Sequence, residues 1–270
     1  MRIPVPDSLR EHAAKVAGNP ATPRPAATIV LVRDGADGIE AYLMRRQSTM
    51  AFAPGVYVFP GGKVQESDAA PVDWVGPSAE EWGERFGCDP ETARALVVAA
   101  VRETFEESGI LLAGPDADTV VGDTSSSEMQ AARVALENGE YGFAQFLAER
   151  SLVLRADLLG AWSHWITPEF EPRRYDTRFF VAALPAGQVV GELPGESDKA
   201  AWMPLTTALA AMKAGEAAML PPTAITCKEV SGLTAQGILE AAAARSIIPI
   251  EPKLVEVDGQ LYLENPLEDP

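Results

Sequence analysis

The stretch Arg102-Glu103-Thr104-Phe105-Glu106-Glu107-Ser108-Gly109 carries most of the information about the fold of this chain. It follows an apolar run, residues 95–101, with the composition of a buried helix, and its final glycine stands where a helix C-cap belongs. Glu103 precedes Glu106 by three residues and Glu107 by four. This spacing predicts that the three carboxylates lie on one helix face, one turn apart.

Glu106 and Glu107 stand near the C-terminal end of this predicted helix, where the helix dipole disfavours negative charge. A bound cation would relieve that repulsion. Clustered carboxylate oxygens suit Mg²⁺ or Mn²⁺, which keep several waters and grip substrate phosphates. The plain alternative is a solvated acidic face on a helix end.

The flanking residues support the helix and supply a second motif. Asp89 is a suitable N-cap, and Pro90 suits the first turn. Upstream, Phe59-Pro60-Gly61-Gly62-Lys63-Val64 forms a predicted glycine turn after a short alternating strand.

Together, the glycine turn and the carboxylate stretch resemble a split Nudix box. The family pattern is G-x5-E-x7-R-E-U-x-E-E-x-G-U, where U is an aliphatic residue. Gly62 matches its first glycine, and the second half is matched by Arg102, Glu103, Glu106, Glu107, Gly109 and Ile110.

The match departs from the pattern in three ways. The pattern places Gly and Arg 14 positions apart, whereas 102 − 62 = 40 here, so about 26 residues are inserted. Counting eight residues back from Arg102 reaches Arg94, where the family has Glu. Thr104 stands where the pattern has an aliphatic residue.

A narrower resemblance is to the coenzyme A diphosphatase branch, closest to its mammalian peroxisomal type with a split box. The end of that branch's loop motif matches residues 55–62, although Ala51 stands where the motif has Arg. Residues 162–168 (Trp-x2-Trp-x-Thr-Pro) and 174–180 (Arg-aromatic-Asp-Thr-x-Phe-Phe) are similar to the same branch.

The resemblance implies a set of functional residues. Gly62, through its carbonyl, and Glu103, Glu106 and Glu107 would hold one to three Mg²⁺ or Mn²⁺ ions. Glu103 or Glu196 would act as the general base, with Glu192 and Asp198 as competitors of Glu196. Arg102 would orient Glu103. The expected substrate contacts are Arg45, Arg46, Phe52 and Arg174, with Arg173 as a further candidate.

The implied fold class is α+β: an α/β/α sandwich, the Nudix fold with a mixed sheet. We expect an N-terminal arm over residues 1–25 and a single Nudix domain over 26–265. Insertions are expected at about 65–90, inside the box, and at about 115–160, where short helices are predicted over 127–136, 143–150 and 157–162. A C-terminal extended arm or hairpin is expected from about residue 245.

Within the domain, residues 26–33 and 39–45 predict a β-hairpin. Residues 205–218 predict a second helix on the sheet. The Pro221-Pro222-Thr223 sequence predicts a chain break after it.

Composition narrows the class of partner. The net charge of −17 argues against a general nucleic-acid or anionic-membrane binder. The two cysteines predict no disulfide framework, and no apolar run reaches membrane-spanning length. We therefore expect a cytoplasmic protein that acts on a small nucleotide-derived molecule; a homodimer is one arrangement that the sequence leaves open.

The implied reaction is metal-dependent hydrolysis of a diphosphate linkage. With coenzyme A or acyl-CoA, the products would be 3′,5′-ADP and (acyl-)4′-phosphopantetheine. The alternatives are an ADP-ribose, dinucleotide or sugar-nucleotide pyrophosphatase, and a non-catalytic Nudix-like module that only binds nucleotides.

Overall fold

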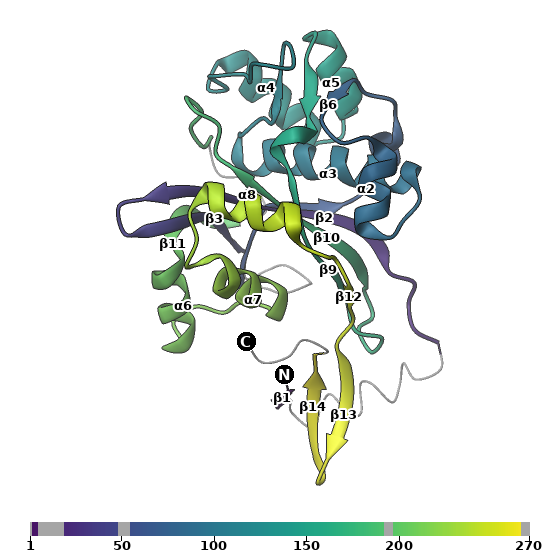
Figure 1. The fold of residues 1–270 in the computed structure, drawn as a ribbon, viewed down its shortest axis with the longest axis vertical. Coiled ribbons are helices and arrows are strands. Elements are labelled where there is room, and N and C mark those ends of the chain that lie inside the picture. Colours follow the sequence, from purple (N-terminus) through teal and green to yellow (C-terminus); the bar gives the residue numbers. More distant parts are fainter. Residues whose placement is uncertain (1, 5–18, 48–54, 192–196, 266–270) are drawn as a thin grey trace.

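The computed structural model describes residues 2–4, 19–47, 55–191 and 197–265 (Figure 1). Within these residues the centre is an eight-stranded sheet in the order β11-β3-β2-β10-β9-β12, with β4 added to β3 and β5 added to β2. Its strands are β2 Arg24–Gly35, β3 Gly38–Arg46, β4 Tyr57–Val58, β5 Gly61–Lys63, β9 Gly160–Ile166, β10 Tyr175–Ala183, β11 Ser197–Pro204 and β12 Pro249–Ile250.

The sheet is mixed because β2 pairs with β10 in parallel and with β3 antiparallel. Both faces of β2 are buried. Ile29 and Leu31 belong to one core cluster, whereas Val30 and Val32 belong to the other. Alternate residues of a strand point to opposite faces, so a continuous apolar run suits a strand that is covered on both sides.

Helices form the two outer layers, which gives the expected α/β/α arrangement (Figure 1). One face carries α2 Ala79–Phe86, α3 Pro90–Ser108, α4 Ser127–Glu137 and α5 Phe143–Glu149. The other face carries α6 Leu205–Lys213, α7 Pro221–Val230 and α8 Ala235–Ala244.

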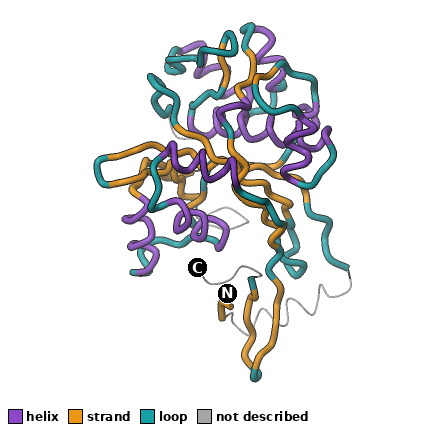
Figure 2. Tube along the Cα trace, viewed as in Figure 1, coloured by secondary structure: helices purple, strands orange, loops and turns teal. Residues whose placement is uncertain are grey.

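The smaller elements connect or extend these layers. The segments on either side of α3 are joined by a short sheet made of β6 Trp74–Val75, β8 Val153–Arg155 and β7 Ala113–Gly114. Two 3₁₀ turns, η1 Glu66–Ala69 and η2 Ala156–Leu158, flank it in sequence. The hairpin of β13 Lys253–Val257 and β14 Gln260–Glu264 pairs with β1 Arg2–Pro4 and extends away from the main sheet (Figure 2).

The predicted hairpin over 26–33 and 39–45 is confirmed as β2 and β3. The prediction of a helix over 157–162 is wrong, because η2 ends at Leu158 and β9 begins at Gly160. Trp162 and Trp165 belong to that strand and are buried in the core, and pairing with β10 outweighs the local helical pattern.

A break does follow the predicted helix, but it lies over residues 214–220, and Pro221 and Pro222 occupy the first turn of a new helix, α7. Proline is tolerated there because the N–H groups of a first helical turn have no partner within the helix. The preceding helix α6 ends at Lys213, five residues before the predicted 218. Among the residues that the structure describes, no helix has both the length and the apolar character needed to cross a membrane.

Candidate active site

Helix α3 presents the carboxylates, and its ends form as the sequence predicts. Asp89 accepts a hydrogen bond from the Thr92 amide at 2.9 Å, and Pro90 follows as the first helical residue. Gly109 ends the helix in the left-handed region at φ 76°, and its amide donates to the Phe105 carbonyl. A Cβ at Gly109 would also lie 3.0 Å from the Gly191 nitrogen, so only glycine fits.

Strand β5 brings the glycine turn against this helix. The Gly61 amide donates to Oε2 of Glu107 at 2.7 Å. A Cβ built on Gly62 would lie 2.4 Å from Oε1 of Glu103 and 2.8 Å from its Oε2. A side chain at position 62 would overlap the Glu103 carboxylate, which explains why glycine stands there. Gly62, Glu103 and Glu107 come together as the box resemblance implies.

Arg102 lies beneath the carboxylates and is almost fully buried. Its Nη1 donates to Oε1 of Glu103 at 2.8 Å and to Oε2 of Glu106 at 3.0 Å. Burial works against its charge, but the hydrogen bond to Asp68 and the charges of Glu103 and Glu106 outweigh burial. The pKa of Arg102 therefore lies above its ordinary value. This geometry is the one expected of a residue that orients Glu103.

Asp68 is the ion-pair partner of Arg102, and the sequence analysis did not identify it. It is fully buried in η1, and it accepts from Nε and Nη2 of Arg102 at 2.8 and 2.9 Å. The Gln65 amide donates to its Oδ2 at 2.8 Å. The Arg102 side chain is thus held from both sides, by Asp68 below and by two of the three box glutamates above.

This pairing corrects the interpretation that Arg94 replaces the missing acid of the box. The pattern requires an acid six residues after its first glycine, and 62 + 6 = 68. Counting forward from Gly62 would have found Asp68, whereas counting back from Arg102 crossed the extra residues. Arg94 lies two turns before Arg102 on α3, and the extra length lies between Asp68 and Arg102.

Glu106 has a buried carboxylate that is only partly hydrogen-bonded. Its side chain is buried, Oε2 accepts from Arg102, and Oε1 has no hydrogen-bond partner. Burial raises the pKa of Glu106 to about 7; the Arg102 charge lowers it and the Glu103 charge raises it further. A buried oxygen without a donor is unfavourable, and a divalent cation beside Glu103 and Glu106 would satisfy it.

The donor set therefore fits a hard divalent ion. The described residues contain no group of three His, Cys, Asp or Glu side chains already converged into a closed metal cage. Instead, Arg102 and the Gly61 amide hold carboxylate oxygens that face the glycine turn. Such an open arrangement matches Mg²⁺, which takes a few carboxylates and completes its shell with water and phosphate.

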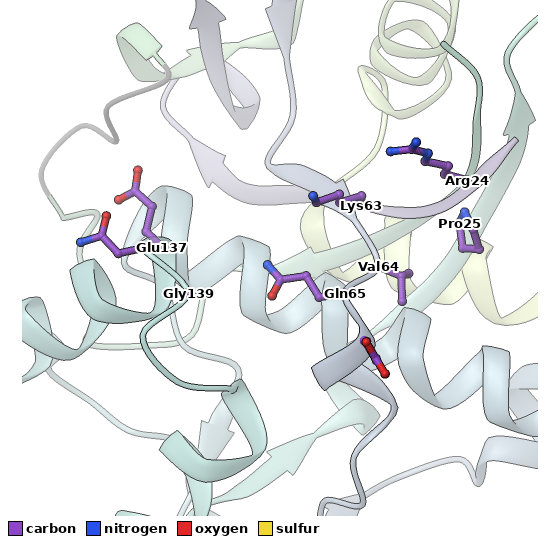
Figure 3. Close-up of a pocket in the computed structure, with 9 residues that line it drawn as sticks. Arg24, Pro25, Lys63, Val64, Gln65, Glu137 and Gly139 are labelled. Carbon is purple, nitrogen blue, oxygen red and sulfur yellow. The ribbon is translucent and has the colours of Figure 1, made fainter.

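A cleft of about 560 Å³ borders the glycine turn, at Lys63 next to Gly62 (Figure 3). Its far side is formed by the end of α4. The cleft is lined by Arg24, Pro25, Lys63, Val64, Gln65, Glu66, Glu137, Asn138 and Gly139. Space for a ligand group larger than a phosphate therefore lies beside the box.

The other predicted site residues belong neither to the glycine turn nor to helix α3. Arg45 and Arg46 end β3, where Arg45 pairs with Tyr57 in β4 and the Arg46 amide donates to the Val56 carbonyl. Both residues thus lie at the C-terminal end of β3, which pairs with β4 and with β11. Glu196 and Phe52 lie outside the described residues, so their roles stay predictions.

Arg174 is built into the fold. Its Nε and Nη1 donate to the carbonyls of Thr167 and Ala21 at 2.9 Å each, and its Nη2 pairs with Glu251. These contacts tie β10 to the chain before β2 and to the segment after β12. A substrate contact from Arg174 stays a prediction that competes with three structural bonds.

The fold and this carboxylate turn define a Nudix hydrolase domain, and comparison with known proteins agrees. The model of the NUDT19 Nudix domain matches residues 81–229, which include α3 and begin after Gly62. The chain belongs to this family.

The relatives include named diphosphatases. Acyl-coenzyme A diphosphatase NUDT19 of Xenopus laevis is 28% identical over 218 residues, covering 68% of this chain and 57% of the relative. The protein of the same name from Homo sapiens is 28% identical over 184 residues, covering 55% and 49%. The chain spans about half the length of the curated relatives that it matches.

A solved structure supports the fold over most of the chain. The Nudix hydrolase from Alicyclobacillus acidocaldarius is 30% identical, with a TM-score of 0.67. The alignment covers 85% of this chain and 99% of that protein. The mixed-sheet Nudix fold is therefore shared along nearly the whole length of that relative.

Proposed function

We propose that this chain hydrolyses a diphosphate linkage in a nucleoside diphosphate derivative, with coenzyme A or acyl-CoA as the substrate. The products are 3′,5′-ADP and (acyl-)4′-phosphopantetheine. The observation that carries the proposal is the packing of the Glu103 and Glu107 carboxylates on the Gly61-Gly62 turn, with a buried, unpartnered oxygen of Glu106 beside them. Carboxylates in this geometry are suited to hold a cation against a phosphate.

The choice of substrate rests on two further observations. The relatives quoted above are named acyl-coenzyme A diphosphatases. Residues 55–62 resemble the end of the loop motif of that branch. The cleft beside Lys63 offers room for a substrate larger than a simple diphosphate.

We also infer how the chain elaborates the Nudix core. An N-terminal arm of residues 1–25 precedes a single domain over 26–265. That domain has insertions at about 65–90 and 115–160, and its last part, from about 245, is a C-terminal extended arm. The position of β6 and α2 between Asp68 and α3 supports the first insertion. The pairing of β6 with β8 supports the view that the two insertions fold together.

The residues that would hold Mg²⁺ or Mn²⁺ are the Gly62 carbonyl, Glu103, Glu106 and Glu107. When bound, the ions offset the charge of the diphosphate and lower the pKa of a water. No geometry beyond the carboxylate contacts described above is needed for this assignment.

The chain's own residues then position and deprotonate the nucleophile. A water oxygen forms a bond to one phosphorus, and the bond from that phosphorus to the bridging oxygen breaks. The departing phosphate keeps the electron pair of the broken bond. Glu103 takes the proton of the water, with Glu196 as the other candidate base. Arg102 donates to Oε1 of Glu103 and so orients the carboxylate that takes the proton.

The test is turnover of coenzyme A, acetyl-CoA, ADP-ribose and NADH with Mg²⁺ and with Mn²⁺, with products separated by chromatography. Formation of 3′,5′-ADP, lost in Glu106→Gln and Glu107→Gln, supports the proposal. Glu240→Gln is the matched control, because Glu240 is exposed on α8, on the other face of the sheet.

Two results would overturn parts of the proposal. Cleavage of ADP-ribose or NADH alone would reject coenzyme A and retain the Nudix reaction. No turnover by folded protein would favour a nucleotide-binding module, and a Mn²⁺ titration would then show whether the carboxylates bind metal.

A further inference from the structure

Arg133 is a buried cation that helix α4 directs inward, toward the end of α3. Only 4% of its surface is exposed, although its neighbour Val134 is 49% exposed. A charged side chain is seldom buried unless it is paired or hydrogen-bonded. Its position therefore calls for an explanation in terms of what it contacts.

Its guanidinium meets the last turn of the carboxylate helix. Nη1 donates to the Glu106 carbonyl at 3.2 Å. That carbonyl is one of those that a helix C-terminus leaves without a partner inside the helix. A cation at this end also counters the helix dipole exactly where Glu106 and Glu107 add negative charge.

The same guanidinium lies against the chain that leads to β11. A Cβ built on Gly191 would be 3.5 Å from both Cζ and Nη1 of Arg133. The Gly191 amide donates to the Ser108 carbonyl at 2.7 Å. Arg133 and Gly191 therefore hold two successive parts of the same helix end.

Arg133 sits at a junction of α3, α4 and the chain at Gly191. Tyr42 is buried in the core on the same side of the sheet. Burial is the largest cause that raises the pKa of Tyr42 to about 12; the Arg133 charge lowers it and the Glu107 charge raises it.

We propose that Arg133 is a positioning residue: from α4 it fixes the turn of α3 that carries Glu106 and Glu107 relative to Gly191. The inference rests on the proposed function, in which those glutamates bind metal. In this proposal, the helical segment of residues 115–160 contributes to the geometry of the metal site. Arg133 acts through the backbone of the turn, because its side chain is buried and bonded to a main-chain carbonyl.

The direction in which Mn²⁺ affinity changes when Arg133 is replaced separates a positioning role from a purely electrostatic one. Removing a cation near carboxylates should tighten the binding of Mn²⁺ if Arg133 acts only by repulsion. If Arg133 positions the turn, Arg133→Met should weaken Mn²⁺ binding to the free protein, and we expect about a fivefold loss by calorimetry. Arg133→Lys, which keeps the charge, should lie between Met and the wild type.

Turnover and amide hydrogen exchange are expected to change together with Mn²⁺ affinity. In Arg133→Met, kcat should fall about tenfold at saturating Mg²⁺ while KM changes less than threefold. Amide hydrogen exchange should become faster over residues 103–111 and stay unchanged over 95–101, in the buried middle of α3.

Arg150→Met is the control from the same helical segment. The Arg150 guanidinium lies 4.6 Å from the Phe146 ring centre and pairs with Glu128 at 3.3 Å. We expect kcat within twofold of wild type and faster exchange only around α5.

Tighter or unchanged Mn²⁺ binding in Arg133→Met would overturn the proposal, as would an equal loss of kcat in Arg150→Met. If the wild-type protein binds no Mn²⁺, the proposed function fails. The exchange over residues 103–111 then decides the positioning role alone, and an unchanged rate there would overturn it.

Discussion

Arg102 and Asp68 form a two-pronged salt bridge with distances of 2.8 and 2.9 Å, and their side chains are 2% and 0% exposed. The bridge joins the end of the glycine turn to the carboxylate helix. Removing one member of a buried ion pair leaves the other charge uncompensated, which costs about 3–5 kcal/mol. It would also release the guanidinium that holds Glu103 and Glu106.

We therefore expect Asp68→Asn to lower the free energy of unfolding by about 3 kcal/mol and to reduce kcat more than tenfold. Urea denaturation and turnover assays measure the two effects. Glu264→Gln is the control, because the Arg2–Glu264 pair is 52% and 39% exposed and exposed pairs contribute about 0–1 kcal/mol. Equal losses in both variants would contradict the structural role of Asp68.

Gly62→Ala should separate activity from stability. The new methyl group would overlap the Glu103 carboxylate, which is the mobile end of a side chain and can move aside. We expect kcat to fall about a hundredfold, on the order of 3 kcal/mol in the barrier, with little change in the unfolding midpoint.

Alanine substitutions at two other glycines provide comparisons for Gly62→Ala. Gly61→Ala would place its methyl group 2.5 Å from the Ala27 carbonyl, which is backbone, and should impair folding. Gly122→Ala meets nothing within 4 Å and should leave kcat unchanged. Full activity in folded Gly62→Ala would show that Glu103 is not needed at that place.

The carboxylate turn could be predicted because its signals are local. The offsets of Glu103, Glu106 and Glu107, the Asp89 cap and the Gly109 stop all lie within one helix. Each of these features depends on residues nearby in the sequence, and these local preferences agree with the tertiary structure.

Asp68 and Arg133 could not be found in that way. Asp68 is separated from Arg102 by the extra segment, so counting back from the helix passed over it. Arg133 lies on a different helix, and the α4 pattern does not tell which element that helix covers. The error at residues 157–162 has the same origin, because β9 is held by β10 and by two core tryptophans.

The metal-free protein should lose stability as the pH rises. Glu106 has a folded-state pKa of about 7, raised from its usual 4.5 chiefly by burial. The folded state thus binds a proton that the unfolded state releases near pH 4.5. Its contribution is complete below about pH 4.5 and is lost as the pH approaches and passes 7, by roughly 3 kcal/mol at most.

Chemical denaturation in EDTA at pH 5, 6, 7 and 8 measures this slope. Glu106→Gln carries no titrating group there, so its stability should be flatter over the same range. The Glu240→Gln control should keep the wild-type slope. An identical slope in Glu106→Gln would assign the pH dependence to other groups.

Divalent ions should reverse this loss, because they bind the folded carboxylates and not the unfolded chain. At a concentration 100 times the dissociation constant, one site adds about 2.7 kcal/mol, which corresponds to roughly 5–10 °C in Tm for a chain of this size. We expect Mg²⁺ or Mn²⁺ at pH 7.5 to raise Tm by that amount relative to EDTA at matched ionic strength. Glu106→Gln should lose most of the rise, whereas Glu240→Gln should keep it. A rise of equal size in all three proteins would place the ion elsewhere and separate metal binding from the Glu103, Glu106 and Glu107 turn.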